Sequence, residues 1–575
     1  MARVKKINAI SDVLDSDTWS SRYLLHKYWA RKPANVVRQY IEHYTRGLDQ
    51  ATVLDPFCGS GVTAVEAVAL GKNAIAVDLN PIACLITKVT AVGPVDIDRL
   101  DSLYRSIMAE VQAELGWLYQ TECAACGNAA TIHSIGWDGP TPVEVRYTCD
   151  RCGNKRSTLT KPVSQWDIDL IGQIEASEIP YWYPDVPVFK GWQTLKLKRA
   201  GMKSFAELYT RRNLWALAAI WHRISQVPDA HLREILAVTF TSVLAQGTKM
   251  IADFKANAGG PSWKINTFWV PSKWQELNVF RFFGNRYEKM RKAKVETNLY
   301  IGEKFAEGRS FQVFNVSSTN LTPMESDDPS AAVLAPESVD YVFTDPPYGG
   351  ESIQYMELSA LWNMWLMHGE IPFDGEVIFN PHRGLDQAYY DRMLAKVFRQ
   401  VYLALRPNRW MSITFHNKES VVWNALLTAC AQAGFVLESI VPLNASAPNL
   451  TQKLTKGAPK TDLILNFRKP GPGEVQQVTF DRALFRDFTS VVVDTAMALI
   501  AREGFTTTGR VFDQVVMKWF TTFFGGPSQS ADEPEMNFMV SDVEGILAAQ
   551  FQTAEDLVEN AQVRERGDTH WVLRA

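Results

Sequence analysis

The sequence predicts an α/β protein built on a largely parallel sheet. Two observations support this class. Residues 51–81 contain a short apolar strand, a glycine turn, an alanine-rich helix, a second strand and an acid, the order of a dinucleotide-type βαβ unit. Residues 339–343 form another apolar run, which ends at the tetrapeptide 345–348. In open α/β sheets, ligands bind at such strand ends.

Length and composition indicate the number of domains and the class of protein. A chain of 575 residues is too long for one domain and predicts about two to four. Its 46% hydrophobic and 21% charged residues are typical of a soluble globular protein. No apolar run has the length of a membrane span, and no signal-peptide core is present, so we expect a cytoplasmic protein without a membrane partner. Seven cysteines are too few for a disulfide framework.

The net charge of −4 conceals a basic block. Residues 190–294 hold 19 Lys and Arg against 6 Asp and Glu, a balance of +13, so the rest of the chain carries −17. Such a block favours a surface for a polyanion. Trp263 and Trp269 lie near Lys264 and Lys273, a mixture that suits stacked bases and neutralised phosphates. A solvated helical surface over a tryptophan core would give the same pattern.

Along the chain, residues 1–20 are polar, and a loop of cations and aromatics follows at 26–33. Lys32 and Pro33 end this loop, and Pro33 suits the start of the helix expected at 36–44. The loop suits an adenosine or a carboxylate ligand. A surface loop over two packed aromatics would explain it equally well.

The βαβ unit supplies the next candidates. Its first strand meets Asp55 and leads into Phe57, Gly59 and Gly61. Glycines here let a cofactor approach the backbone, and the second strand ends at Asp78, whose carboxylate can hold both hydroxyls of a ribose. The glycine pair alone is weak evidence, because plain tight turns also use glycine. The complete unit with its terminal acid is the stronger indication.

Four cysteines form two Cys-x-x-Cys pairs with 22 residues between them: Cys123, Cys126, Cys149 and Cys152. Glycine follows each pair, and 131–137 and 143–148 alternate like short strands. This spacing predicts a zinc ribbon, whose closed four-thiolate site implies a structural ion. Free thiols are the alternative.

Further elements follow from apolar periodicity. We expect helices at 96–118, 205–224, 231–246, 353–367 and 389–405, and strands at 311–316, 410–415, 435–441 and 462–467. Pro470–Gly473 marks a boundary, beyond which the chain is expected to be mostly helical, without assignable chemistry.

The corner after the strand at 339–343 carries the candidate chemistry. Pro346 and Pro347 fix φ and supply no N–H donor, so the chain is stiff there and its carbonyls remain available. Asp345 and the Pro346 carbonyl can accept the two hydrogens of an exocyclic amine, while Tyr348 can stack on a planar base. A strand with a proline-rich turn and no chemistry is the alternative.

Together these motifs resemble the amino-group DNA methyltransferases, which act on adenine N6 or cytosine N4, and most closely the adenine-specific methylases that carry a zinc ribbon. The likeness covers residues 22–98 and 311–469 together with the ribbon. It implies a Rossmann-like, S-adenosylmethionine-dependent methyltransferase sheet with a long zinc-ribbon and helical insertion and a helical carboxyl-terminal region. The implied division is 1–98 and 311–470 for the methyltransferase domain, 99–310 for the insertion, with the ribbon at about 120–156, and 471–575 for the carboxyl-terminal region.

The resemblance also implies roles for single residues. Asp78 would hold the ribose of S-adenosylmethionine, and the other cofactor-binding residues would be Lys32, Pro33, Asp55, Phe57, Gly59 and Gly61. The catalytic residues would be Asp345, Pro346, Pro347 and Tyr348. Two features depart from the family. Asn315 and Ser317 stand where many relatives have an acid near the adenine of the cofactor, and the long insertion prevents transfer of target-recognition residues.

The implied reaction is direct methyl transfer to adenine N6 of a base turned out of double-stranded DNA. The alternatives are cytosine N4 in DNA, guanine N2 in RNA, and a non-catalytic nucleic-acid-binding relative. Asp at the first motif position favours adenine, where serine would favour cytosine. The expected cofactors are S-adenosylmethionine and structural zinc. A restriction-modification context with a partner restriction or defence protein is compatible with the sequence.

Overall fold

The computed structural model describes residues 7–12, 20–152, 158–252, 263–306, 311–326, 328–349, 353–417, 419–443, 462–474, 488–523, 540–553 and 570–573. Gly153, and most of the polar segment expected at 1–20, lie outside these ranges. Within them, no helix combines the length and the apolar character needed to cross a membrane.

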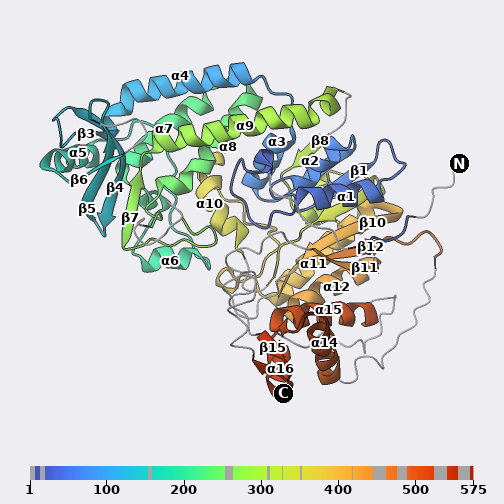
Figure 1. The fold of residues 1–575 in the computed structure, drawn as a ribbon. Coiled ribbons are helices and arrows are strands. Elements are labelled where there is room, and N and C mark those ends of the chain that lie inside the picture. The colour runs from blue at the N-terminus through green and yellow to red at the C-terminus, as the bar shows by residue number, and fades with distance from the viewer. Residues whose placement is uncertain are drawn as a thin grey trace.

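A seven-stranded sheet lies at the centre of the protein (Figure 1). Its spatial order is β11-β12-β10-β9-β1-β2-β8, and neighbouring strands are parallel except where β12 pairs with β10 and β11. The chain proceeds outward from β1 to one side and from β9 to the other, so the order reverses between β1 and β9. The strands are β1 (Thr52–Asp55), β2 (Asn73–Val77), β8 (Phe311–Phe314), β9 (Val339–Thr344), β10 (Leu405–Phe415), β11 (Val436–Leu443) and β12 (Asp462–Arg468).

Helices cover both faces of this sheet. Successive strand residues point to opposite faces, so Val53 packs on the side of α1 and α2, and Leu54 on the side of α11 and α12. All of β9 is buried, because both of its faces are covered. The expected α/β class with a mostly parallel sheet is therefore confirmed. The helices around the sheet are α1 (Ala34–Tyr44), α2 (Val62–Ala69), α3 (Pro81–Ala91), α11 (Gln387–Ala404) and α12 (Ser420–Ala433), whereas α10 (Tyr355–Leu366) packs against α3 and the inserted helices.

The segment between β2 and β8 forms a helical body with a small sheet at its far end (Figure 1). The long helix α9 runs beside α4, where Arg291 bonds to Asp101 (2.9 Å). In the small sheet, β4 pairs with β3, β5 and β7, and β5 pairs with β6. Its strands are β3 (Gln120–Glu122), β4 (Ala129–Asp138), β5 (Thr141–Thr148), β6 (Leu159–Pro162) and β7 (Lys273–Leu277). The helices are α4 (Ile97–Leu115), α5 (Gln165–Ala176), α6 (Thr194–Arg199), α7 (Arg211–Ser225), α8 (Ala230–Leu244) and α9 (Val279–Ala306).

The described carboxyl-terminal residues are mostly helical, as expected, and pack on the α11–α12 side of the sheet through residues such as Val492 and Val511. Their elements are α14 (Phe488–Glu503), α15 (Thr508–Phe523), α16 (Val540–Gln550) and the short strands β13 (Thr506–Thr507), β14 (Gln552–Thr553) and β15 (His570–Val572).

Candidate active site

A pocket of about 950 Å³ opens at the carboxyl ends of β1, β2, β8 and β9. This is where the strand order reverses, the position at which open α/β sheets bind ligands. The pocket therefore brings together two motifs that lie far apart in the sequence. The predicted site residues that line it are Lys32, Asp55, Phe57, Gly59, Asp78, Asp345 and Pro347. Pro33, Pro346 and Tyr348 adjoin them in the chain, and Gly61 lies between Ser60 and Val62, which also line the pocket.

The turn after β1 needs glycine at two positions. Gly59 has a φ of +49°, and a Cβ there would lie 3.2 Å from the ring of Tyr28. Gly61 has a φ of +82°, and a Cβ there would lie 2.9 Å from Thr87 on α3. Both positions favour glycine through their positive φ. Gly59 lets the ring of Tyr28 lie close to the turn, and Gly61 lets α2 and α3 approach each other.

Asp78 holds this turn from the end of β2. Its Oδ2 accepts a hydrogen bond from the Gly59 N–H (3.0 Å), and its Oδ1 accepts one from the Asn80 N–H (2.9 Å). Each carboxylate oxygen has a further lone pair, so Asp78 can still accept from hydroxyl groups of a ligand. Burial raises the pKa of Asp78 to about 6, which leaves it anionic at neutral pH.

Asp55 connects the glycine turn to the strand that carries Asp345. Its Oδ1 accepts from the Phe57 N–H (3.1 Å) and from the hydroxyl of Thr344, the last residue of β9 (2.9 Å). Burial raises the pKa of Asp55 to about 7. These bonds hold the two halves of the pocket in register.

Asp345 lies in a network of charged groups. Lys32 Nζ is 3.2 Å from Asp345 Oδ2, and the Tyr348 hydroxyl donates to Asp345 Oδ1 (2.9 Å). Lys32 also donates to the Tyr348 hydroxyl (2.8 Å) and to Asp462 Oδ2 (2.8 Å), and His416 Nδ1 is 3.6 Å from Asp462 Oδ1. The three protons of Lys32 are thus directed at Asp345, Tyr348 and Asp462.

This network sets the charge of Asp345. Burial raises the pKa of Asp345, Lys32 and Tyr348 lower it, and Asp462 raises it, and the net result is a pKa of about 6. The side chain of Asp345 is only 16% exposed, so these neighbours act with little screening by solvent. Asp345 is consequently ionised at neutral pH and protonated in mild acid.

The two prolines differ in their contacts. The Pro347 carbonyl accepts from the Tyr390 hydroxyl (2.8 Å), which fixes the corner against α11. The Pro346 carbonyl has no hydrogen-bond donor among the described residues. The Pro346 carbonyl is therefore an available acceptor beside Asp345, whereas the Pro347 carbonyl is already bonded, and the catalytic roles expected for both prolines remain predictions.

Several pocket residues were not predicted from the sequence. Tyr28 stacks on Tyr355 (6.4 Å between ring centroids) and accepts from Asn80 Nδ2 (3.3 Å), forming an aromatic wall. Glu376 lines the pocket next to Gly375, whose carbonyl accepts from Ser317 Oγ (3.1 Å). Ser317, which stands where many relatives have an acid, thus has Glu376 nearby. Glu376 belongs to the segment that follows α10. Tyr28 belongs to the cation–aromatic loop and could have been singled out, whereas no local pattern marks Glu376.

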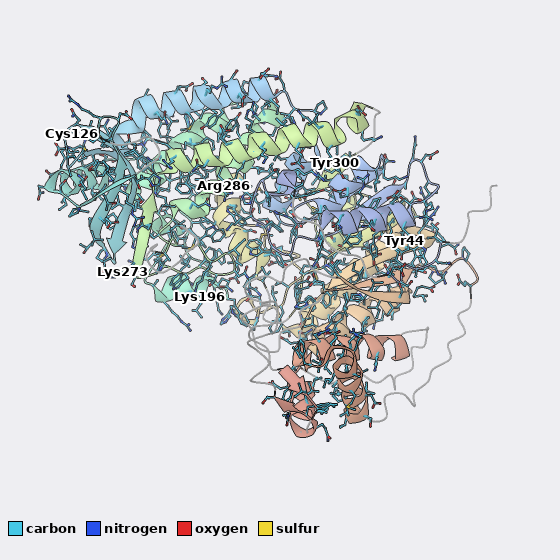
Figure 2. All side chains as sticks on the ribbon, in the orientation of Figure 1. Tyr44, Cys126, Lys196, Lys273, Arg286 and Tyr300 are labelled. Carbon is cyan, nitrogen blue, oxygen red and sulfur yellow. The ribbon has the colours of Figure 1, made fainter. Side chains whose placement is uncertain are left out.

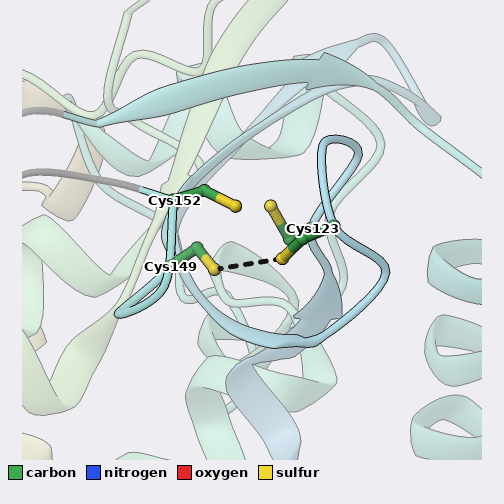
Figure 3. A group of neighbouring side chains, drawn as sticks. Cys123, Cys149 and Cys152 are labelled. Carbon is green, nitrogen blue, oxygen red and sulfur yellow. Dashed lines mark hydrogen bonds between the residues drawn. The ribbon is translucent and has the colours of Figure 1, made fainter.

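The four paired cysteines meet at one end of the small sheet (Figure 3). Their sulfur atoms all lie within 4.8 Å of one another, and Cys126 Sγ is 3.8 Å from Cys149 Sγ. This distance exceeds a disulfide bond, of about 2.05 Å. Sulfurs bound to a single zinc at about 2.3 Å in a tetrahedron are about 3.8 Å apart. The cluster therefore fits a metal ion.

A family model matches the part of the sequence that contains the glycine turn and Asp78. Residues 3–89 match the family model of the N6/N4 DNA methylases, described as DNA methylase. The match includes the loop at 26–33, β1, the glycine turn and Asp78, and it confirms the resemblance to amino-group DNA methyltransferases. No curated protein matches the sequence.

Two solved structures were also compared. A candidate DNA modification methylase of Thermus thermophilus is 16% identical, with a TM-score of 0.14, and the match covers 28% of this chain and 58% of that chain. Phosphoethanolamine N-methyltransferase 2 of Haemonchus contortus, solved with phosphomonomethylethanolamine and S-adenosylhomocysteine, is 10% identical, with a TM-score of 0.16. That match covers 77% of this chain and 100% of that chain. TM-scores this low support no argument about this chain.

Proposed function

We propose that this chain, whose residues 3–89 match the N6/N4 DNA methylases, is an S-adenosylmethionine-dependent methyltransferase that methylates adenine N6 in double-stranded DNA. One observation supports this most strongly. The turn of Gly59 and Asp78 and the amine-accepting corner of Asp345 line the same pocket.

The first half of the pocket fits the cofactor. Gly59 and Tyr28 line this half of the pocket side by side, and Asp78 has lone pairs left for the ribose hydroxyls. Tyr28 and Phe57 add aromatic walls, and Glu376 is the proposed acid for the adenine end. When bound, S-adenosylmethionine supplies a methyl group on a positively charged sulfur.

The second half fits an aromatic amine. Such an amine is a poor nucleophile, because its lone pair is delocalised into the ring. Asp345 and the Pro346 carbonyl would accept its two hydrogens and favour a pyramidal nitrogen with an available lone pair. This is electrostatic preorganisation combined with alignment. The nitrogen that gains the methyl group becomes cationic and must lose a proton, and ionised Asp345 is placed to accept it.

Lys32 has a different proposed role from the cofactor contact expected by resemblance. Its ammonium group is surrounded by Asp345, Tyr348 and Asp462. We assign it to keeping Asp345 ionised. Tyr348 is proposed to stack on the target base, as the sequence motif suggests.

The choice of adenine rests on Asp at the first position of the motif. Cytosine N4 in DNA and guanine N2 in RNA use an amine of the same kind and are the alternative substrates. The cysteine cluster is proposed to hold one structural zinc ion as a ribbon, because four thiolates leave no open coordination position for chemistry.

The decisive test is methyl transfer to duplex DNA from S-adenosylmethionine with a labelled methyl group, followed by nucleoside analysis. We expect label in N6-methyladenine with the native protein and none with Asp345→Ala. Binding of the cofactor without transfer to any nucleic acid would support a non-catalytic relative and refute the proposal.

A further inference from the structure

The basic block at 190–294 divides into two groups of cations. One group serves the fold: Arg212 pairs with Glu276 (3.2 Å), and Arg223 pairs with Glu114 (2.5 Å). Lys294 is buried and donates to the Val89 carbonyl at the end of α3 (2.7 Å). These residues are not available to a ligand.

A second group surrounds a hollow of about 930 Å³ between the loop at 26–33 and α9. The cations that line it are Lys27, Arg31, Arg286, Lys289 and Lys292, and no carboxylate is among the lining residues that the structure describes. None of Lys27, Arg286, Lys289 and Lys292 has a carboxylate within 4.0 Å among the described residues. Glu288 lines the adjoining hollow along α9, together with Arg286, Lys289 and Lys292.

The cations of this hollow repel one another. Burial and the neighbouring charges of Arg286 and Lys289 lower the pKa of Lys27. Burial also lowers the pKa of Arg286. Several cations held together without an anion form a site for a ligand that carries repeated negative charge.

The hollow adjoins the active-site pocket. Tyr28 and Arg31 line both. Arg31 donates through Nη2 to the His26 carbonyl in the hollow (2.9 Å) and through Nε to Ser60 Oγ in the pocket (3.3 Å). An anion in the hollow would therefore lie next to the base-binding pocket.

The spacing on α9 suits a strand of nucleic acid. Arg286, Lys289 and Lys292 follow one another at three-residue intervals, so they lie on neighbouring turns and span about 9 Å along the helix. Phosphates of one DNA strand advance by about 3.4 Å per nucleotide along the duplex axis. The row can therefore meet roughly two or three consecutive phosphates.

We propose that Lys27, Arg286, Lys289 and Lys292 bind backbone phosphates of the duplex beside the base that enters the pocket. This inference rests on the proposed function and adds the surface that holds the substrate. It places the principal phosphate contacts of the basic block on α9. Figure 2 shows Arg286 on α9 and Lys196 on α6 well apart from each other.

The test compares two double variants that remove equal charge from the same insertion. Lys289→Gln/Lys292→Gln changes the proposed surface, and Lys198→Gln/Arg199→Gln changes exposed cations on α6. Binding of a fluorescent DNA duplex is measured from about 0.05 to 0.3 M salt, where each phosphate contact contributes about 0.9 to the slope of log K against log salt. The α9 variant should lose about 1.8 from this slope, which means about 60-fold weaker binding than the native protein at 0.1 M if their affinities are equal at about 1 M salt.

The α6 variant should retain the native slope, and Lys289→Arg/Lys292→Arg should restore it. An α9 variant with the native slope, or an α6 variant that loses as much, overturns the inference. An α9 variant that binds an RNA duplex more weakly but binds the DNA duplex as the native protein does also overturns the inference. Calorimetry with S-adenosylhomocysteine verifies that each variant keeps its pocket. Failure of the native protein to bind or methylate DNA overturns the proposed function as well, whereas an unchanged slope in an active protein overturns this inference alone.

Discussion

Replacing Lys32 with Met should move the acid limb of the pH–rate profile to higher pH. In the native protein, burial raises the pKa of Asp345 and Lys32, at 3.2 Å, lowers it, and the net pKa is about 6. Ionised Asp345 is the form that accepts hydrogens from the amine. Loss of the ammonium group leaves Asp345 facing Asp462 without a cation between them.

The expected size follows from the geometry. An opposite charge within about 4–6 Å shifts a carboxyl pKa by about 1–3. A rise of about 2 would bring the pKa of Asp345 to about 8, and its ionised fraction at pH 7 would fall from about nine-tenths to about one-tenth. Activity at pH 7 should thus fall about tenfold and return near pH 9.

The assay is kcat/KM for DNA between pH 5 and 9.5, which reports the ionisations of the free enzyme. Asp462→Asn is the matched variant, because Asp462 raises the pKa of Asp345 and its loss should move the acid limb to lower pH. Opposite shifts in the two variants support the network. An unmoved limb in both variants, or a rise only in the KM for S-adenosylmethionine in Lys32→Met, would refute this role for Lys32.

Three further results are expected. Asp345→Ala should raise the barrier to transfer by about 3 kcal/mol or more while cofactor affinity stays within a few-fold, and near-normal turnover would exclude its assigned role. Asp78→Ala should weaken cofactor binding by about 1.5–3 kcal/mol in calorimetry, whereas an unchanged Kd would make Asp78 only a turn residue. One equivalent of zinc should copurify with the native protein, and the Cys123→Ser and Cys149→Ser variants should lose it. Metal analysis that finds no zinc in the native protein would refute the zinc site.

Local sequence patterns correctly predicted the strands and turns that form the pocket. The runs around β1, β2 and β9 are short, apolar and bounded by glycine, proline or acid, so their positions follow from neighbouring residues alone. The paired cysteines were likewise predicted by spacing, and the structure brings all four sulfurs together. The division into domains and the roles of the site residues remain predictions.

The features that were missed depend on distant parts of the chain. β7 becomes a strand by pairing with β4, and Lys32 meets Asp462 across 430 residues. Helix α9 was not predicted, because its seven Lys and Arg residues conceal an apolar stripe. That stripe includes the buried Phe283, Tyr287 and Met290. Local periodicity does not indicate which distant part of the chain these residues will contact.

The central claim is tested most directly by identifying the methylated nucleoside. Native protein and Asp345→Ala would be incubated separately with duplex DNA and with total RNA, in the presence of S-adenosylmethionine carrying a heavy-isotope methyl group. The nucleic acid would then be digested and its nucleosides measured by mass spectrometry. We predict heavy N6-methyladenine from the DNA with the native protein alone. Heavy N4-methylcytosine, heavy N2-methylguanosine from the RNA, or no heavy nucleoside from a protein that binds the cofactor would contradict the account.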